Sequence, residues 1–163
     1  NRLVKGLESV DSLDILQKLS VNFDVQLMHE ELYAPHAPLE FSMYVDGAWY
    51  SLKLKHALIN ELLSEKLDAN VLTQRVLSPV FGIEDLRNDE RIGFLSGLKG
   101  PSELKRLVDK GEYQIAFGLF PVRMEQFFSF SDQDRIMPPK TTWFEPKLLN
   151  GLVIYDIYPE KHQ

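Results

Sequence analysis

The sequence contains no cysteine, and this absence removes several classes of site at once. Without a thiol there is no disulfide framework, no thiolate nucleophile, and no zinc or iron–sulfur centre held by cysteine. Because disulfides are rare in reducing compartments, we expect a cytoplasmic protein. No run approaches the roughly eighteen apolar residues of a membrane-spanning helix, and the N-terminus lacks the order of a signal peptide. We therefore expect no membrane partner.

The usual metal and nucleotide motifs are also missing. No Gly-x-x-x-x-Gly-Lys or Gly-x-Gly-x-x-Gly run occurs, and no two histidines have the His-x-x-x-His spacing of a helical metal site. His29, Glu30, Glu31 and His36 form the only histidine cluster, which is more typical of a solvated strand end and loop. The acidic stretch at residues 85–90 lacks the central glycine of a calcium loop. The sequence thus predicts no metal site and leaves any cofactor and any catalytic residue unknown.

Size and charge indicate a single acidic domain. The 163 residues are enough for a core that buries roughly 70 per cent of the unfolded surface, so residues 1–163 are expected to form one domain. The formal charge of -6 argues against a nucleic-acid partner, because such binding depends largely on phosphate neutralisation by Lys and Arg. A glycine pair at residues 97–100 resembles backbone clamps of some RNA-binding modules, but a plain turn explains it better.

Hydrophobic periodicity predicts an α+β fold with a mainly antiparallel mixed sheet of about five or six strands covered by about five helices. The strongest local signal is Asp46-Gly47 between two strand-like runs, the preferred two-residue hairpin turn. Asp11 and Asp68 are expected to cap helices, and Ser78-Pro79 to end one. Helices are expected at 11–22, 58–66, 68–77, 101–111 and 122–131. Strands are expected at 24–28, 41–45, 48–55, 92–95, 113–119 and 152–158, with the strand at 113–119 half-buried.

A basic, proline-rich segment near the C-terminal end is the main candidate site. Residues 135–147 contain three basic side chains against one acidic, and the prolines at 138, 139 and 146 stiffen an extended path. A rigid path loses less entropy when it binds a ligand, and its ammonium and hydroxyl groups can hold a phosphate or carboxylate. The alternative is that its aromatic residues fill the core while the lysines remain solvated. The candidate binding residues here are Lys140, Thr141, Thr142, Trp143 and Lys147.

The same segment carries a resemblance to a known family. The run Met137–Lys147, with the apolar residues 151–154 behind it, is similar to the C-terminal signature of the bacterial domain-of-unknown-function 1015 family. Supporting similarities are the opening residues 1–5, the hairpin residues 46–50, and residues 67–72 and 80–83. They follow the family's order and span nearly the whole chain.

This resemblance implies that the chain is the C-terminal part of a protein more than twice as long. The chain also begins at Asn1 rather than at methionine, which favours the same expectation. Relatives carry an upstream Asp-Gly-His-His-Arg run similar to one in nucleotide-using ParB-like and sulfiredoxin-like proteins, and they are loosely associated with serine metabolism. That run is absent here, so the resemblance assigns this chain at most part of a site. Arg2 and Lys5, near the junction with the missing upstream part, would contribute to it together with the basic segment.

Two functional hypotheses follow. In the first, the chain is a substrate- or phosphate-contacting domain of an uncharacterised cytoplasmic enzyme that acts on a small phosphorylated metabolite or nucleotide, and it shows no turnover alone. In the second, it is a non-catalytic module whose basic segment docks on the missing N-terminal half or on a second subunit, which allows an oligomer. An exposed apolar patch would favour the second hypothesis.

Overall fold

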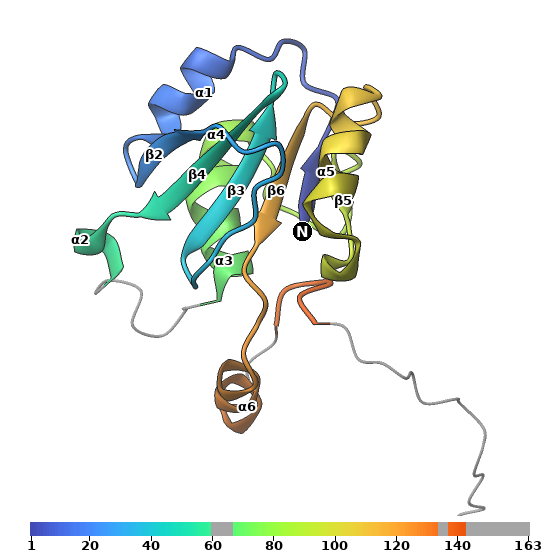
Figure 1. The fold of residues 1–163 in the computed structure, drawn as a ribbon. Coiled ribbons are helices and arrows are strands. Elements are labelled where there is room, and N and C mark those ends of the chain that lie inside the picture. The colour runs from blue at the N-terminus through green and yellow to red at the C-terminus, as the bar shows by residue number, and fades with distance from the viewer. Residues whose placement is uncertain (60–66, 134–136, 143–163) are drawn as a thin grey trace, which may run out of the picture.

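The computed structural model describes residues 1–59, 67–133 and 137–142, and its centre is one antiparallel sheet (Figure 1). Its six strands are β1 (Arg2–Val4), β2 (Phe23–Met28), β3 (Glu40–Val45), β4 (Ala48–Leu54), β5 (Ile92–Phe94) and β6 (Ile115–Leu119). They lie in the order β2-β4-β3-β6-β1-β5, and every neighbouring pair is antiparallel. The α+β class with a mainly antiparallel sheet is therefore confirmed. The expected strand at 152–158 lies outside the described residues.

The hairpin forms as its turn residues predict. Asp46 and Gly47 join β3 to β4 with φ angles of 49° and 75°, the left-handed values that a two-residue turn of this kind requires. The alternation along β3 also agrees with the sequence, because Phe41, Met43 and Val45 all enter the same core cluster. The hairpin therefore fixes both the register and the inward face of the central strands.

Strand β1 is an element that the sequence did not predict. Residues 2–4 lie between β6 and β5, with Arg2 opposite both Phe117 and Phe94. Three residues are too few to show a period of two, and their partners are about ninety or more positions away along the chain. An interior position for β1 is what brings Arg2 into the body of the domain.

Two helices begin or end where their capping residues predict. Helix α1 (Ser12–Leu19) is capped by Asp11, whose Oδ1 accepts hydrogen bonds from the amides of Leu13 and Asp14 at 3.0 and 3.3 Å. Helix α5 (Gly100–Asp109) follows a short 3-10 turn, η2 (Gly97–Lys99), and gives way to Gly111 with φ 71°. Helix α2 (His56–Ile59) begins near the expected helix at 58–66, of which residues 60–66 are outside the described part.

The prediction that Ser78-Pro79 ends a helix is wrong. Helix α3 (Asp68–Leu72) leads directly into a π-helical turn, η1 (Thr73–Leu77), and then into α4 (Ser78–Phe81). Proline is tolerated in the first turn of a helical segment, and the preceding π turn is wider than an α turn. The chain leaves the helix only at Gly82, which adopts the left-handed φ of 63°.

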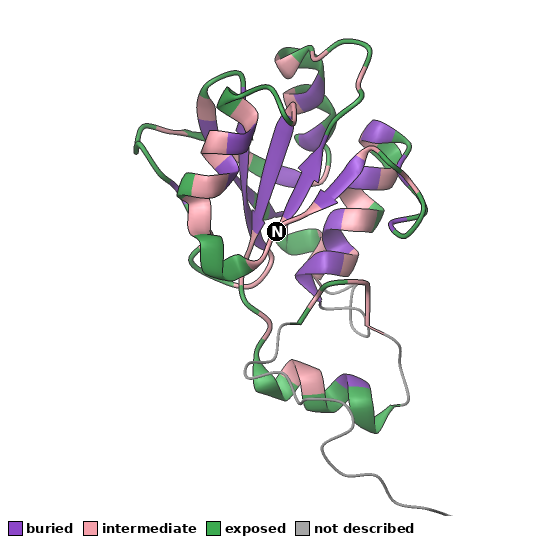
Figure 2. Cartoon of the chain, turned by 90° about the vertical axis from the view of Figure 1, so that its right-hand side faces the viewer, coloured by how far each residue is buried: buried purple, intermediate pink, exposed green. Residues whose placement is uncertain are grey.

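The sheet is covered on both faces. One face packs on α1 and on the α3–α4 region around Leu19, Phe41, Leu72 and Leu77, and the other packs under α5 around Leu104. Strand β6 is consequently buried on both faces, so the expectation of a half-buried strand at 113–119 is wrong. Helix α6 (Met124–Asp132), close to the expected helix at 122–131, lies beyond the end of β6 and is exposed over much of its surface (Figures 1 and 2).

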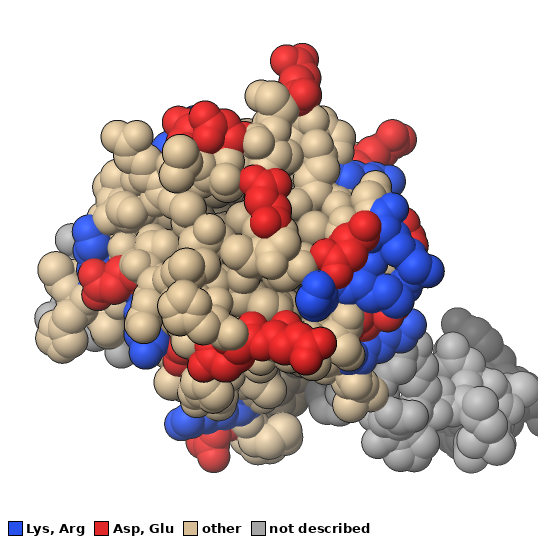
Figure 3. Space-filling view, turned by 45° about the horizontal axis from the view of Figure 1, so that its top comes forward, with Lys and Arg blue, Asp and Glu red and all other residues tan. Residues whose placement is uncertain are grey.

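Oppositely charged side chains form ion pairs on the surface of α5. Arg106 pairs with Glu103 at 2.7 Å and Lys105 pairs with Asp109 at 2.6 Å, both within α5. Figure 3 shows basic and acidic side chains next to one another on this side of the molecule. Within the described ranges, no helix has the length and apolar character needed to cross a membrane.

Candidate functional site

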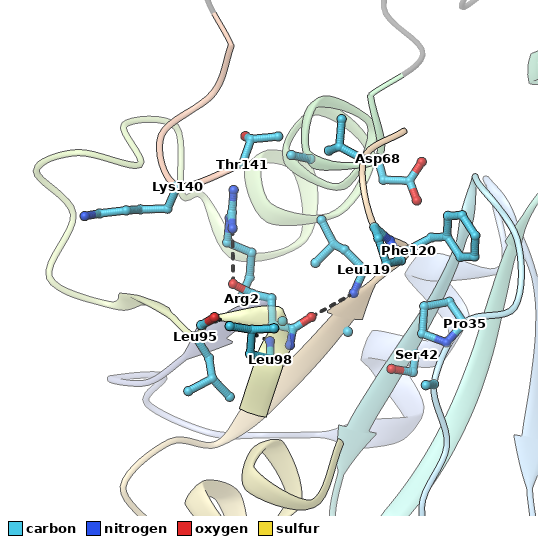
Figure 4. Close-up of a pocket in the computed structure, with 18 of the residues that line it drawn as sticks. Arg2, Pro35, Ser42, Asp68, Leu95, Leu98, Leu119, Phe120, Lys140 and Thr141 are labelled. Carbon is cyan, nitrogen blue, oxygen red and sulfur yellow. Dashed lines mark hydrogen bonds between the residues drawn. The ribbon is translucent and has the colours of Figure 1, made fainter. Parts of the chain in front are cut away.

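A pocket of about 890 Å³ lies at one end of the sheet, where β1 and β3 begin and β5 and β6 end (Figure 4). Its wall is completed by the start of α3, by η2 and the first turn of α5, by the start of α6, and by residues 140–142. The volume is within the range of pockets that hold metabolites and cofactors. The pocket is thus built from segments that are far apart in the sequence and meet only in the fold.

Much of the pocket wall is apolar. Phe94, Leu95, Leu98, Leu104, Leu119, Phe120 and Met124 contribute to it. Leu98, on η2, has 75% of its surface exposed, and Met124, at the start of α6, has 54%. A ligand that covers these apolar side chains removes their surface from water, which favours binding. The few polar groups among them are the ones that can set its orientation.

Arg2 is the most unusual polar group in the pocket, because this arginine is only 1% exposed. Its Nη1 donates to the carbonyl of Asn1 at 3.1 Å, its Nη2 donates to the carbonyl of Pro139 at 3.0 Å, and its Cζ lies 4.7 Å from the centre of the Phe94 ring. Its Nε has no hydrogen-bond partner, and within the described residues no carboxylate pairs with it. Burial lowers the pKa of Arg2 to about 10, which still leaves it charged at neutral pH.

The predicted basic segment meets Arg2 in this pocket. Lys140, Thr141 and Thr142 line it, and the hydrogen bond from Arg2 to Pro139 connects the segment to β1. Lys140 is exposed, and its side chain extends away from the Arg2 guanidinium (Figure 4). Thr141 donates its hydroxyl hydrogen to the carbonyl of Pro138 at 2.7 Å, so this hydrogen is already used within the turn.

Of the other predicted site residues, the structure places Lys5 away from the pocket. Lys5 does not line the pocket, because it follows the far end of β1 and its Nζ lies 5.9 Å from the centre of the Tyr113 ring. Trp143 and Lys147 lie outside the described residues. The structure therefore brings together Arg2 and residues 140–142 from the predicted set, and it separates Lys5 from them.

Asp68 is a pocket residue whose role the sequence did not indicate. The prediction that it caps a helix is wrong, since the N-cap position is Leu67 and Asp68 is the first residue of α3. Its Oδ1 accepts a hydrogen bond from the amide of Leu39 at 3.0 Å, and Leu39 has a positive φ of 66°. Its Oδ2 has no hydrogen-bond partner, although the carboxylate is only 6% exposed.

The surroundings of Asp68 favour its neutral form more than water does. Burial raises the pKa of Asp68 to about 6, against the opposing influence of the backbone amides of Leu39 and Phe120. A carboxyl with such a pKa in a pocket is a frequent sign of a functional site.

Ser42 is a third buried polar group in the pocket, and it too was not predicted. It lies on β3, is fully buried, and its Oγ has no hydrogen-bond partner. Gly118 faces it across the β3–β6 ladder, and a Cβ at position 118 would collide with the Ser42 hydroxyl. A glycine at the end of an apolar strand was the one sequence signal for a close approach here.

Comparison with known proteins identifies the family. Residues 1–71 match the family described as Protein of unknown function (DUF1015). This match supports membership of the family, and it covers less than half of the chain. The matched part includes two of the four supporting similarities, residues 1–5 and 46–50, and all but the last residue of a third. Arg2, Ser42 and Asp68 also lie within it, whereas Lys140 lies outside it. No curated protein and no solved structure matches the chain.

The donor set of the site is not that of a metal centre. Across residues 1–59, 67–133 and 137–142, no three or more histidine and acidic side chains lie together in a way that could hold an ion. What the pocket does offer is a buried guanidinium, a buried carboxylate and a buried hydroxyl, each with an unused polar atom, set in an apolar wall. Such an arrangement is suited to binding a small polar organic molecule.

Proposed function

We propose that the chain binds a small anionic metabolite or nucleotide in this pocket, through Arg2 and with Lys140 at the rim. The observation that carries the proposal is the Arg2 guanidinium, which is buried and charged and has no carboxylate partner within the described residues. A buried cation without a counter-ion is costly, and an anion at this place would relieve that cost. A phosphate or carboxylate oxygen can accept directly from the free Nε–H.

The rest of the pocket supports a ligand that also has an apolar or planar part. Its volume is large enough for a molecule of about nucleotide size, and its wall includes Phe94, Phe120 and Leu119. The anionic group would set the orientation, and the remaining part would contribute apolar contact. Lys140 is exposed, so we expect it to attract the anion more than to hold it.

The wider setting is part of the same proposal. The family resemblance supports a C-terminal part of a longer bacterial cytoplasmic protein, with serine metabolism as the context of a phosphorylated substrate. Because the upstream Asp-Gly-His-His-Arg run is not in this sequence, we expect the chain alone to bind without catalysing turnover.

Calorimetric titration of the chain with inorganic phosphate, ATP, phosphoserine and serine tests the proposal. We expect at least one phosphate compound to bind and serine to bind more weakly than phosphoserine. Arg2→Met should weaken phosphate binding by about tenfold or more, because it removes a charge-assisted hydrogen bond in a buried place. Lys140→Ala should weaken it by no more than about fivefold, as expected for an exposed charge.

Lys5→Ala is the matched control, since it removes one positive charge just after the far end of β1, from a residue that does not line the pocket. It should bind like the unmodified chain. Thermal unfolding of each variant separates loss of binding from loss of the fold. Equal affinity of the unmodified, Arg2→Met and Lys140→Ala chains, or no binding of any phosphate compound at millimolar concentration, contradicts the proposal.

A docking module remains the second candidate, and one observation favours it. Leu98, Met124 and Phe128 are all more than half exposed, and α6 lies apart from the main body of the sheet. Exposed apolar side chains of this kind are typical of an interaction surface. Light scattering distinguishes the two: self-association that Leu98→Ser and Phe128→Ser abolish, without any phosphate binding, supports docking.

A further inference from the structure

Two buried groups of opposite charge line the same pocket, and neither has a counter-ion within the described residues. Arg2 is hydrogen-bonded to carbonyl groups, and Asp68 interacts with backbone amides rather than with a cationic side chain. Each also has an unused polar atom, Nε on Arg2 and Oδ2 on Asp68. Buried charges in proteins are usually paired, so two unpaired ones in one pocket call for an explanation.

The fold itself keeps the two groups apart. Arg2 comes from the start of β1, and Asp68 comes from the start of α3. Leu119, at the end of β6, and Phe120 after it lie between them, and Arg2 and Asp68 are on either side of that segment in Figure 4. Hydrogen bonds to Pro139 and Leu39 hold the two charged groups in their separate positions. They form no ion pair with each other in this structure.

We infer that the pocket takes a ligand that carries both an anionic group and a protonated amine, the first held at Arg2 and the second at Asp68. The inference rests on the proposed function, because it presupposes that Arg2 binds the anion. A protonated amine would place a positive charge and an N–H donor at the unpartnered Oδ2 of Asp68, and so satisfy both its charge and its hydrogen-bonding capacity.

A neutral donor explains Asp68 less well. A hydroxyl or amide would complete the hydrogen bond, but it would leave the negative charge of the buried Asp68 carboxylate uncompensated. The pKa of about 6 means that Asp68 is mostly ionised at neutral pH, so the pocket presents a carboxylate rather than a carboxylic acid. The buried Ser42 hydroxyl is a further group that a polar ligand can contact.

The test uses ligand pairs that differ only in the amine. Aminoethyl, aminobutyl and aminohexyl phosphate are each titrated calorimetrically into the chain beside the alkyl phosphate of equal carbon number, at about pH 7.5. Three alkyl chain lengths are used so that the amine of at least one compound can reach Asp68 while its phosphate contacts Arg2. For at least one pair, we expect the amine to improve affinity by about tenfold or more, as for an ion pair in a partly desolvated site.

Asp68→Asn is the decisive variant, because it keeps an oxygen for the Leu39 amide and removes the charge. We expect it to abolish the preference for the amine while the alkyl phosphate binds as before. Equal affinity within all three pairs, or a preference that survives in Asp68→Asn, overturns the inference and leaves the proposed function standing. Failure of every phosphate to bind overturns both. If Asp68→Asn does not fold, the pairs measured on the unmodified chain still decide.

Discussion

Glu40 and Asp68 are two buried carboxylates close to the start of β3, and the fold treats them in opposite ways. Glu40 accepts from the Tyr33 hydroxyl, from Ser51 at 3.2 Å and from the His36 amide at 3.2 Å. Asp68 accepts one hydrogen bond and leaves an oxygen unused in the pocket. The pKa of Glu40 is lowered because its hydrogen bonds and the nearby Lys53 outweigh its burial, whereas burial raises that of Asp68.

The contrast shows that this fold can provide several hydrogen-bond donors to a buried carboxylate with a structural role. The Glu40 cluster joins β3, β4 and the loop that contains Tyr33. The incomplete partnering of Asp68 is therefore not a general feature of the domain's interior. It coincides with the pocket, where Arg2 and Ser42 are incompletely partnered as well.

The largest effect is expected from Glu40→Ala. Removing this carboxylate leaves the buried Ser51 hydroxyl without its acceptor and takes one of two acceptors from Tyr33, so the free energy of unfolding should fall by about 3 kcal/mol or more. Chemical denaturation measures this loss. A loss below about 1 kcal/mol would show that the cluster is not structural, and the comparison with Asp68 would fail.

The next largest effect concerns the pH dependence of stability. The pKa of Asp68 is about 6 in the folded chain and 3.8 when its carboxyl is fully solvated, as in the unfolded chain, so the folded state retains this proton to higher pH and stability should fall as pH rises from about 4 to about 6. Asp68→Asn removes this titration. The stability of the variant relative to the unmodified chain should therefore increase across this interval, by up to about 3 kcal/mol.

Glu40 provides the opposite slope in the same experiment. Its lowered pKa means that it contributes stability above its unfolded pKa and that this contribution is lost as pH falls through the lower folded value. The comparison would be contradicted if Asp68→Asn and unmodified chains kept the same stability difference at pH values of about 4 and 7, as measured by denaturant titration.

A smaller effect is expected at Gly118, which makes room for Ser42. Gly118→Ala should lower the free energy of unfolding by about 1 to 3 kcal/mol, because the new Cβ overlaps the Ser42 hydroxyl. Adding Ser42→Gly should recover much of this loss. Gly97→Ala is the control, since a Cβ there meets no atom within 4 Å. If the double variant is no more stable than Gly118→Ala, the close approach is not the cause.

Local chemistry explains which parts of the fold the sequence could predict. The Asp46-Gly47 turn, the Asp11 cap and the helix end before Gly111 each depend on a few neighbouring residues. Strand β1 could not be found in this way, because only its pairing with β5 and β6 makes it a strand. The π turn before Pro79 was missed for a similar reason, since it is rare and has no clear local signal.

The candidate site was predictable only in part. The basic, proline-rich composition led to Lys140, Thr141 and Thr142, which do line the pocket. The burial of Arg2 could not be read from its charge, because arginine is almost always exposed. Asp68 looked like a helix cap by its position in the sequence, and only the tertiary arrangement shows its carboxylate in the pocket.

A crystal structure of the chain grown with an aminoalkyl phosphate tests the central claim most directly, which is that Arg2 receives an anion in this pocket. The account predicts a phosphate oxygen within hydrogen-bond distance of Arg2 Nε, with the guanidinium still bonded to the Pro139 carbonyl. A ligand bound elsewhere, or a pocket in which Arg2 Nε instead meets a carboxylate of the chain itself, would contradict it.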